Sequence, residues 1–390
     1  MATRFTFRRL VQALKTQLLE KKVTVYPSYG YESAEKHGIW MVPMRVWIHD
    51  DRDTPFVEQA FERWALRYFE KDLERPLERA EKDRLERTLE HFIADDKSRE
   101  TVELVFADDP HERVFAFSQF SSHNGVIEES IRVPDELVQE LHARQSDGSR
   151  WLKIRVRTTD GNGAGEGLVR FLSPDGLSVV SDIDDTVKVT NVPSGRKTVL
   201  RNVFLKEFRA AAGMRERYEK LVADAGSGAD VCFHYVSGSP WQIFGLLQEF
   251  LIAEQQFPVG TFHMKNLRKN LFEAGALESI RAFVLGGDLA TLDQKIRQIT
   301  TLMMHLPRRQ FILIGDSGER DPEVYRALQR LFPSQVQQII IRDVLGERLH
   351  GMERISGEDV AVSLDTSDLE AEMAAVVLRA SVDAPNSAKL

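Results

Sequence analysis

The sequence has little of several features that mark particular classes of protein. Its 390 residues include one cysteine, Cys232, so no disulfide can form within the chain and a reducing compartment is favoured. No apolar run is as long as a membrane-spanning helix, and the first residues lack the apolar core of a secretory signal. We therefore expect a cytoplasmic protein, with peripheral binding to a membrane left open.

An excess of positive charge is also missing. The chain has 52 Lys and Arg residues against 60 Asp and Glu residues, a formal net charge of −8. Proteins that bind the nucleic-acid backbone normally carry a clear basic excess, so we expect no nucleic-acid partner. Basic residues do gather locally between Lys188 and Lys220, where nine of them stand against three acidic ones. This segment forms either a solvated helix face or a positive mouth for an anionic substrate.

The length and the 42% hydrophobic content favour two domains over one. Residues 1–22 predict a basic amphipathic helix, which either packs on the protein, lies on anionic lipid or resembles a transit peptide. Residues 23–173 alternate in short strands typical of an antiparallel β-sandwich, with a helical insertion at about 55–95. Residues 361–390 read as a C-terminal tail.

Strands alternate with helical segments over residues 174–360, which predicts an α/β domain with a parallel sheet and helices on both of its faces. The expected strands cover residues 177–182, 230–236, 282–284, 310–314 and 338–341.

Acidic residues follow two of these strands directly. The first strand ends at Asp182, with Asp184 and Thr186 directly after it, and the fourth strand is followed by Asp316 and Asp321. Because ligands bind at the carboxyl ends of parallel strands, we expect these side chains to lie close together. Mg²⁺ is typically held by one or two carboxylates together with phosphate oxygens and water. The pattern therefore indicates phosphoryl chemistry with Mg²⁺ as the cofactor.

The same residues carry a family resemblance. The string 182–186 matches the D-x-D-x-T motif of haloacid dehalogenase-type phosphatases, and residues 315–321 match their G-D-x-x-x-x-D motif. The longer strings SDIDDTVK at 181–188, FHYVSGSPWQ at 233–242 and FILIGDSG at 311–318 resemble the App1 phosphatidate phosphatase family, which is related to the lipin catalytic domain. The resemblance covers roughly residues 177–345.

This resemblance implies a haloacid dehalogenase-like Rossmannoid domain that hydrolyses phosphatidate, on an anionic membrane surface, to diacylglycerol and phosphate. Two alternatives stay open, namely a phosphatase of a soluble phosphomonoester and a lipid-binding module without catalysis. The presence of both Asp182 and Asp184 disfavours the second alternative.

The chemistry of a phosphate ester suggests a role for each acid. Asp182 is the candidate nucleophile that forms an aspartyl-phosphate, and Asp184 the candidate general acid and base, which requires a raised pKa. The family pattern implies that Asp182, the backbone carbonyl of Asp184 and Asp316 bind Mg²⁺. Asp321 would orient water or a ligand without touching the metal.

Further residues are candidates for holding the phosphate. Ser237 matches the hydroxyl motif of the family, and Ser239 competes with it. Lys295 is the candidate lysine that balances the phosphate charge. Thr186 either contacts the phosphate or, as we favour, braces its loop through backbone hydrogen bonds. Alternatives to the lysine lie in one short segment: Lys265, Arg268 and Lys269.

Overall fold

The computed structural model describes residues 21–50, 55–93, 95–145, 150–226, 228–266, 288–346 and 360–363. The helix expected over the first 22 residues falls outside this part, except that Lys21 and Lys22 begin a strand. Also outside it are the strand expected at 282–284, Arg268, Lys269 and residues 364–390 of the expected tail. The chain forms two compact units, one made of Met1–Gln59 and Ile93–Leu172 and the other of Ala60–Phe92 and Ser173–Leu390.

The first unit is built on one continuous mixed sheet with the main order β1-β3-β2-β9-β8-β5-β6, and β4 and β7 also pair with β3. Buried and partly exposed residues alternate along the long strand β3, as in a strand with one face on a core. The unit also contains helix α4 (Asp135–Arg144). Its strands are β1 (Lys21–Val25), β2 (Ser28–Glu32), β3 (Ile39–Asp50), β4 (Asp95–Asp96), β5 (Val102–Phe106), β6 (Phe115–Ala116), β7 (Val126–Pro134), β8 (Leu152–Thr158) and β9 (Gly163–Phe171).

The expectation of a purely antiparallel sandwich is wrong, because β1 and β2 both run parallel to β9. Glycines at alternate positions of β9 make this pairing possible. A Cβ placed on Gly165 would lie 1.7 Å from the carbonyl oxygen of Val23 in β1, and Gly163 and Gly167 are similarly close to that strand. Only residues without a side chain allow so close an approach of the two backbones.

The expected helical insertion forms the pair α2 (Pro55–Leu73) and α3 (Arg79–Ile93). In sequence this pair interrupts the first unit, but residues 60–92 belong by their contacts to the second unit. Rings of Phe69 and Phe92 pack against Phe204, with centroids 6.0 and 5.5 Å away. The carboxylate of Asp72 also accepts a hydrogen bond from Arg201. Both partners lie on helix α5 (Arg196–Phe204).

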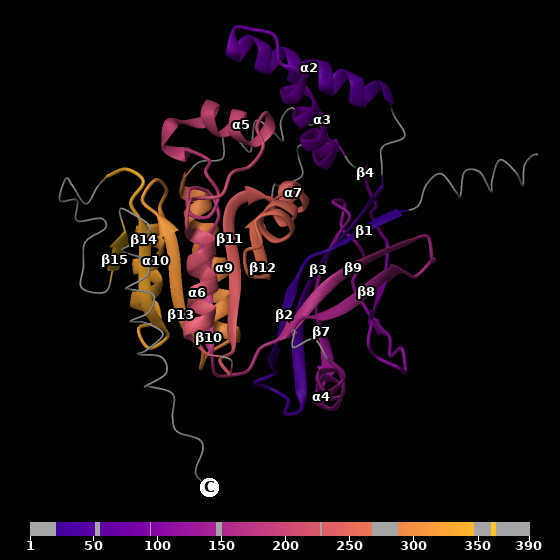
Figure 1. Cartoon of the computed structure of the whole chain (residues 1–390). Helices are drawn as coiled ribbons and strands as arrows, with labels where there is room; N and C mark the ends of the chain where they lie inside the picture. Colours follow the sequence, from indigo (N-terminus) through magenta and orange to yellow (C-terminus); the bar gives the residue numbers. More distant parts are fainter. Residues whose placement is uncertain are drawn as a thin grey trace, which may run out of the picture. The chain divides into compact units, whose positions relative to one another are not determined.

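The second unit contains a six-stranded sheet in which every pairing is parallel (Figure 1). Its strands, in spatial order, are β12 (Gly260–Lys265), β11 (Val231–Pro240), β10 (Leu177–Asp182), β13 (Gln310–Asp316), β14 (Val336–Arg342) and β15 (Val360–Ser363). Four of the expected strands are confirmed within a few residues, whereas β12 and β15 were not expected. The helices that follow its strands include α6 (Met214–Asp224), α7 (Phe244–Gln248), α9 (Asp288–His305) and α10 (Asp321–Leu331).

The strand order determines where a ligand can bind. After β10 the chain adds β11 and β12 on one side, and β13, β14 and β15 then extend the other side. The order therefore reverses at β10, and a crevice opens at such a point beyond the carboxyl ends of the strands. All six residues of β10 are buried, so the strand is fixed on both faces. Among the described residues, no helix combines the length and apolar character that crossing a bilayer requires.

Candidate active site

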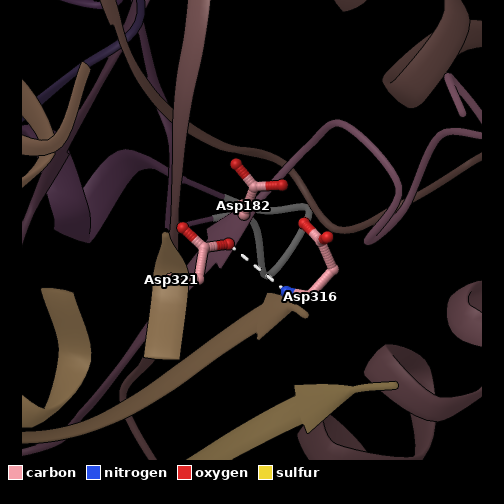
Figure 2. A group of neighbouring side chains, drawn as sticks. All are labelled: Asp182, Asp316 and Asp321. Atoms are coloured by element: carbon pink, nitrogen blue, oxygen red, sulfur yellow. Dashed lines mark hydrogen bonds between the residues drawn. The ribbon is translucent and has the colours of Figure 1, made fainter. Parts of the chain in front are cut away.

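Three aspartates meet where β10 and β13 end. Asp182 is the last residue of β10, Asp316 the last residue of β13, and Asp321 the first residue of α10. One carboxylate oxygen from each lies within 4.8 Å of the other two, and all three side chains are buried (Figure 2). The structure thus brings together acids that are up to 139 positions apart in the sequence because two adjacent parallel strands end side by side.

The loop after β13 holds two of these carboxylates in place. Oδ2 of Asp321 accepts a hydrogen bond of 3.3 Å from the backbone N–H of Asp316, drawn as the dashed line in Figure 2. Oδ1 of Asp316 accepts one of 2.5 Å from the N–H of Gly318. A Cβ on Gly315 would lie 2.4 Å from Oδ2 of Asp321. Glycine is therefore required at position 315 for α10 to begin so close to the strand.

Lys295 of α9 is the cation of this cluster. Its buried Nζ donates hydrogen bonds to Oδ1 of Asp182 at 2.8 Å and to Oδ1 of Asp321 at 2.6 Å. A third bond of 2.9 Å goes to Oε2 of Glu319, a residue that the sequence reasoning missed. Burial alone would lower the pKa of Lys295, but the three carboxylates raise it well above its usual value.

The cluster holds more negative than positive charge. Burial, together with the neighbouring carboxylates, raises the pKa of both Asp182 and Asp316 well above the usual range, and Lys295 only partly opposes this. Oδ2 of Asp182 and Oδ2 of Asp316 are buried without a hydrogen-bond partner within the described part of the chain. Orphaned carboxylate oxygens are costly in a protein interior. A hard divalent cation would compensate them, so this donor set fits Mg²⁺.

Asp184 points to a different set of partners. One of its oxygens accepts hydrogen bonds from Nζ of Lys188 at 2.6 Å and from Oγ1 of Thr190 at 2.7 Å. The other accepts from the hydroxyls of Ser237 and Ser239 at 3.1 and 3.0 Å. Burial alone would raise the pKa of Asp184, but Lys188 and the hydroxyl donors outweigh it and lower it to about 2. The expected raised pKa is therefore wrong for this structure, because the sequence reasoning did not place Lys188 beside Asp184.

The loop that follows β10 is braced by another acid. Asp185 has a left-handed backbone, with φ of 57°, and its carboxylate accepts bonds from the backbone N–H groups of Thr190, Asn191 and Val192. Thr186 is buried, and its Oγ1 has no hydrogen-bond partner among the described residues. The bracing that we expected of Thr186 is instead carried by Asp185.

The remaining candidates separate by position. Ser237 and Ser239 contact the same oxygen of Asp184, so both belong to the site and the geometry does not favour one. Lys265 lies 3.4 Å from the hydroxyl of Thr291 and takes no part in the ion pairs found for Lys295. Beside Lys295, a cavity of about 370 Å³ is lined by Val192, Thr291, Leu292, Lys295, Gly318, Glu319 and Arg320.

Comparison with known proteins identifies the segment that carries this site. Residues 177–343 match the family model described as the catalytic domain of the phosphatidate phosphatase APP1. This part of the chain is therefore similar to the App1 catalytic domain, and we call it the App1-type segment. The App1-type segment begins with β10 and ends just after β14, so it contains all the candidate site residues named above.

Two curated relatives are similar to part of this chain. The phosphatidate phosphatase APP1 of Saccharomyces cerevisiae is 36% identical over 174 residues, which is 44% of this chain and 27% of the relative. An uncharacterized protein of Schizosaccharomyces pombe is 27% identical over 184 residues, 46% of this chain and 27% of the relative. The chain thus spans about a quarter of the length of either relative.

Among solved structures, a β-glucuronidase of Ruminococcus gnavus matches with a TM-score of 0.26 and 9% identity, over 88% of this chain and 46% of that one. A likeness this weak has no bearing on fold or function.

Two residues of the site were missed by the sequence reasoning although signals for them existed. Glu319 stands between Asp316 and Asp321 in a loop already identified as acidic. Lys188 closes the string SDIDDTVK, four positions after Asp184. Sequence spacing could not show that both side chains turn back toward the aspartates, because loop geometry and not helical or strand periodicity decides their direction.

Proposed function

We propose that this protein is a Mg²⁺-dependent phosphatidate phosphatase with a haloacid dehalogenase-like catalytic domain, which forms diacylglycerol and phosphate through an aspartyl-phosphate. The observation that carries the proposal is the convergence of Asp182, Asp316, Asp321 and Lys295 within the segment that matches the App1 catalytic domain. The 36% identity to a protein named phosphatidate phosphatase supports the choice of substrate.

The metal would be held by Asp182, Asp316 and the backbone carbonyl of Asp184. Support comes from the two orphaned Oδ2 atoms, one on each of the first two residues. Both oxygens of Asp321 already accept hydrogen bonds from the protein, which suits a role in holding the cluster together. When bound, the ion neutralises charge on the phosphate and on the attacking carboxylate.

In the first chemical step a carboxylate oxygen of Asp182 would form a bond to phosphorus while the bond from phosphorus to the glyceride oxygen breaks. Lys295 keeps the nucleophile oriented and balances the charge of the phosphate. Asp184 is ionised in the structure described here, and an incoming phosphate dianion raises its pKa and offers the hydroxyls of Ser237 and Ser239 another acceptor. Asp184 then takes up the proton that it gives to the leaving alkoxide.

In the second step Asp184, now a carboxylate, would remove a proton from water as the water oxygen attacks phosphorus. The bond between phosphorus and Asp182 breaks, and phosphate is released. One residue thus acts as acid and then as base, and its ability to hold a proton must change between the two steps.

The test is Mg²⁺-dependent phosphate release from phosphatidate in mixed micelles, compared with a panel of soluble phosphomonoesters. Asp182→Asn should reduce release by about 1000-fold or more, because it removes the nucleophile. Asp175→Asn is the matched control, since the exposed carboxylate of this residue pairs with Arg308. Preference for a soluble ester would keep the mechanism and overturn the substrate. Lipid binding without any release would favour the non-catalytic alternative.

The proposed substrate implies that this protein works at an anionic membrane surface, because phosphatidate resides in a bilayer. Co-sedimentation with vesicles that contain or lack phosphatidate tests this part separately. Binding that depends on anionic lipid supports it, and equal recovery in the supernatant with both kinds of vesicle contradicts it. A variant without residues 1–20 would show whether the basic segment contributes to binding.

A further inference from the structure

The ring of Phe208 contacts two cations. Nζ of Lys188 is 4.9 Å from the ring centroid, and Cζ of Arg84 is 4.5 Å from it. Both distances are within the range of a cation–π interaction. Lys188 comes from the loop after β10, whereas Arg84 comes from α3. A single ring therefore connects the helical insertion with the loop that carries Asp184.

Lys188 is buried and contacts several groups in this arrangement. The residue is 1% exposed, and its Nζ also donates to Asp184 and to Thr190 at 2.6 and 2.5 Å. The backbone carrying Phe208 runs beside the backbone carrying Lys188, because the N–H of Val189 bonds to Arg209 and the N–H of Ala211 bonds to Val187. The position of the Asp184 carboxylate therefore depends on where Lys188 is held.

Arg84 is held in a costly position. Its side chain is 5% exposed, and within the described residues its only hydrogen bond runs from Nη1 to Oε2 of Glu207, at 3.1 Å. Its Nε and Nη2 atoms are buried without a partner in the same part of the chain. A buried guanidinium with so few hydrogen bonds is unfavourable for stability. Besides the ion pair with Glu207, this position provides the contact with the ring of Phe208.

We propose that Arg84 and Phe208 are positioning residues for the general acid. Helix α3, although it lies outside the App1-type segment, holds the ring of Phe208 against Lys188, and Lys188 in turn fixes the Asp184 carboxylate. This inference rests on the proposed function, because that function gives Asp184 its role in proton transfer. It also gives the helical insertion a catalytic purpose.

The proposal has a consequence that a merely structural role would not have. If the ring is lost, Lys188 and Asp184 shift and proton delivery to the leaving oxygen slows. A leaving alkoxide needs that proton, whereas a p-nitrophenolate departs without one. The rate loss should therefore depend on the leaving group. From the usual strength of a cation–π contact we expect a loss of about 3- to 30-fold for the alkyl ester.

The experiment measures kcat/KM for phosphatidate and for p-nitrophenyl phosphate with the full chain. Phe208→Leu and Arg84→Met should each lose activity toward phosphatidate through kcat, with KM unchanged, and lose less than about 2-fold toward the aryl ester. Phe208→Tyr, which keeps the ring, should recover most of the rate lost in the leucine variant. Arg87→Ala is the matched control, because Arg87 pairs with the same Glu207 and is half exposed.

Equal losses for the two esters would overturn the proposal in favour of a structural role, as would wild-type rates in Phe208→Leu. If circular dichroism shows that this variant does not fold, the ratio of the two ester activities in Arg84→Met decides instead. Wild-type protein that hydrolyses neither ester would refute the proposed function and, with it, this inference. If the wild-type protein hydrolyses phosphatidate and the variants do so at the same rate, only this inference is refuted and the proposed function stands.

Discussion

Replacing Lys295 by methionine tests the arrangement of the site most directly. The substitution keeps most of the apolar stem but removes the ammonium group, which lies 2.6–2.9 Å from oxygens of Asp182, Glu319 and Asp321. Without it, three carboxylates face one another in a buried site. Any charge that remains on them must then be compensated by a metal or removed by protonation.

The size of the effect follows from this burial. Removing one partner of a buried ion pair costs about 3–5 kcal/mol, and we expect this loss in the free energy of unfolding of Lys295→Met at pH 8 without metal. The carboxyl groups can relieve it by taking up protons. Groups whose folded-state pKa is raised stabilise the fold below their unfolded pKa, and this contribution is lost as the pH rises through the folded pKa. The loss in the free energy of unfolding caused by Lys295→Met should therefore be smaller at pH 5 than at pH 8, by about half or more.

Urea unfolding followed by circular dichroism at the two pH values measures this, with Lys265→Met as control. Lys265 bonds only to Thr291 Oγ1 within the described residues, so its loss should cost less than about 1 kcal/mol at either pH. Phosphate release by Lys295→Met should fall by about 100-fold or more. Equal deficits in both variants, or a Lys295→Met deficit that does not change with pH, would refute the reasoning.

Three further substitutions follow from single contacts, each measured by urea unfolding. Gly315→Ala places a Cβ 2.4 Å from Oδ2 of Asp321. It should lower the free energy of unfolding by about 1–3 kcal/mol and should also reduce activity. The pKa of Asp184 is about 2, so the ion pair between Asp184 and Lys188 stabilises the fold above pH 4 and is lost as the pH falls toward 2. Lys188→Met should therefore lower the free energy of unfolding at pH 7, and its difference from the wild type should become smaller over that range. Burial and the charge of His305 lower the pKa of His263 to about 4, so the neutral ring stabilises the fold above pH 6.5 and this is lost as the pH falls toward 4. Between pH 6.5 and pH 4, the free energy of unfolding of His263→Gln should therefore depend less on pH than that of the wild type. The same slope of this free energy against pH in both proteins would contradict the prediction.

Much of the site is visible in the sequence because its two main parts are local patterns. Apolar strands that end in Asp182 and Asp316 identify both the strands and the edge where they meet, since parallel strands end on the same side. Lys295 was only one of several candidate lysines, because a helical position does not show which face is buried. The lowered pKa of Asp184 could not be foreseen, because it depends on loop residues folding back on the strand.

The sequence by itself determined four of the six strands of the parallel sheet, the two acidic strand ends and the chemistry that they suggest, because periodicity and strand ends are local properties. Only the tertiary structure decided that β1 and β2 run parallel to β9 and that the helices between β3 and β4 pack with the second unit. It alone placed Arg84 against Phe208 and so beside Lys188. Local periodicity makes a helix amphipathic but does not specify the surface that its apolar face will cover, and that choice depends on packing between residues more than a hundred positions apart.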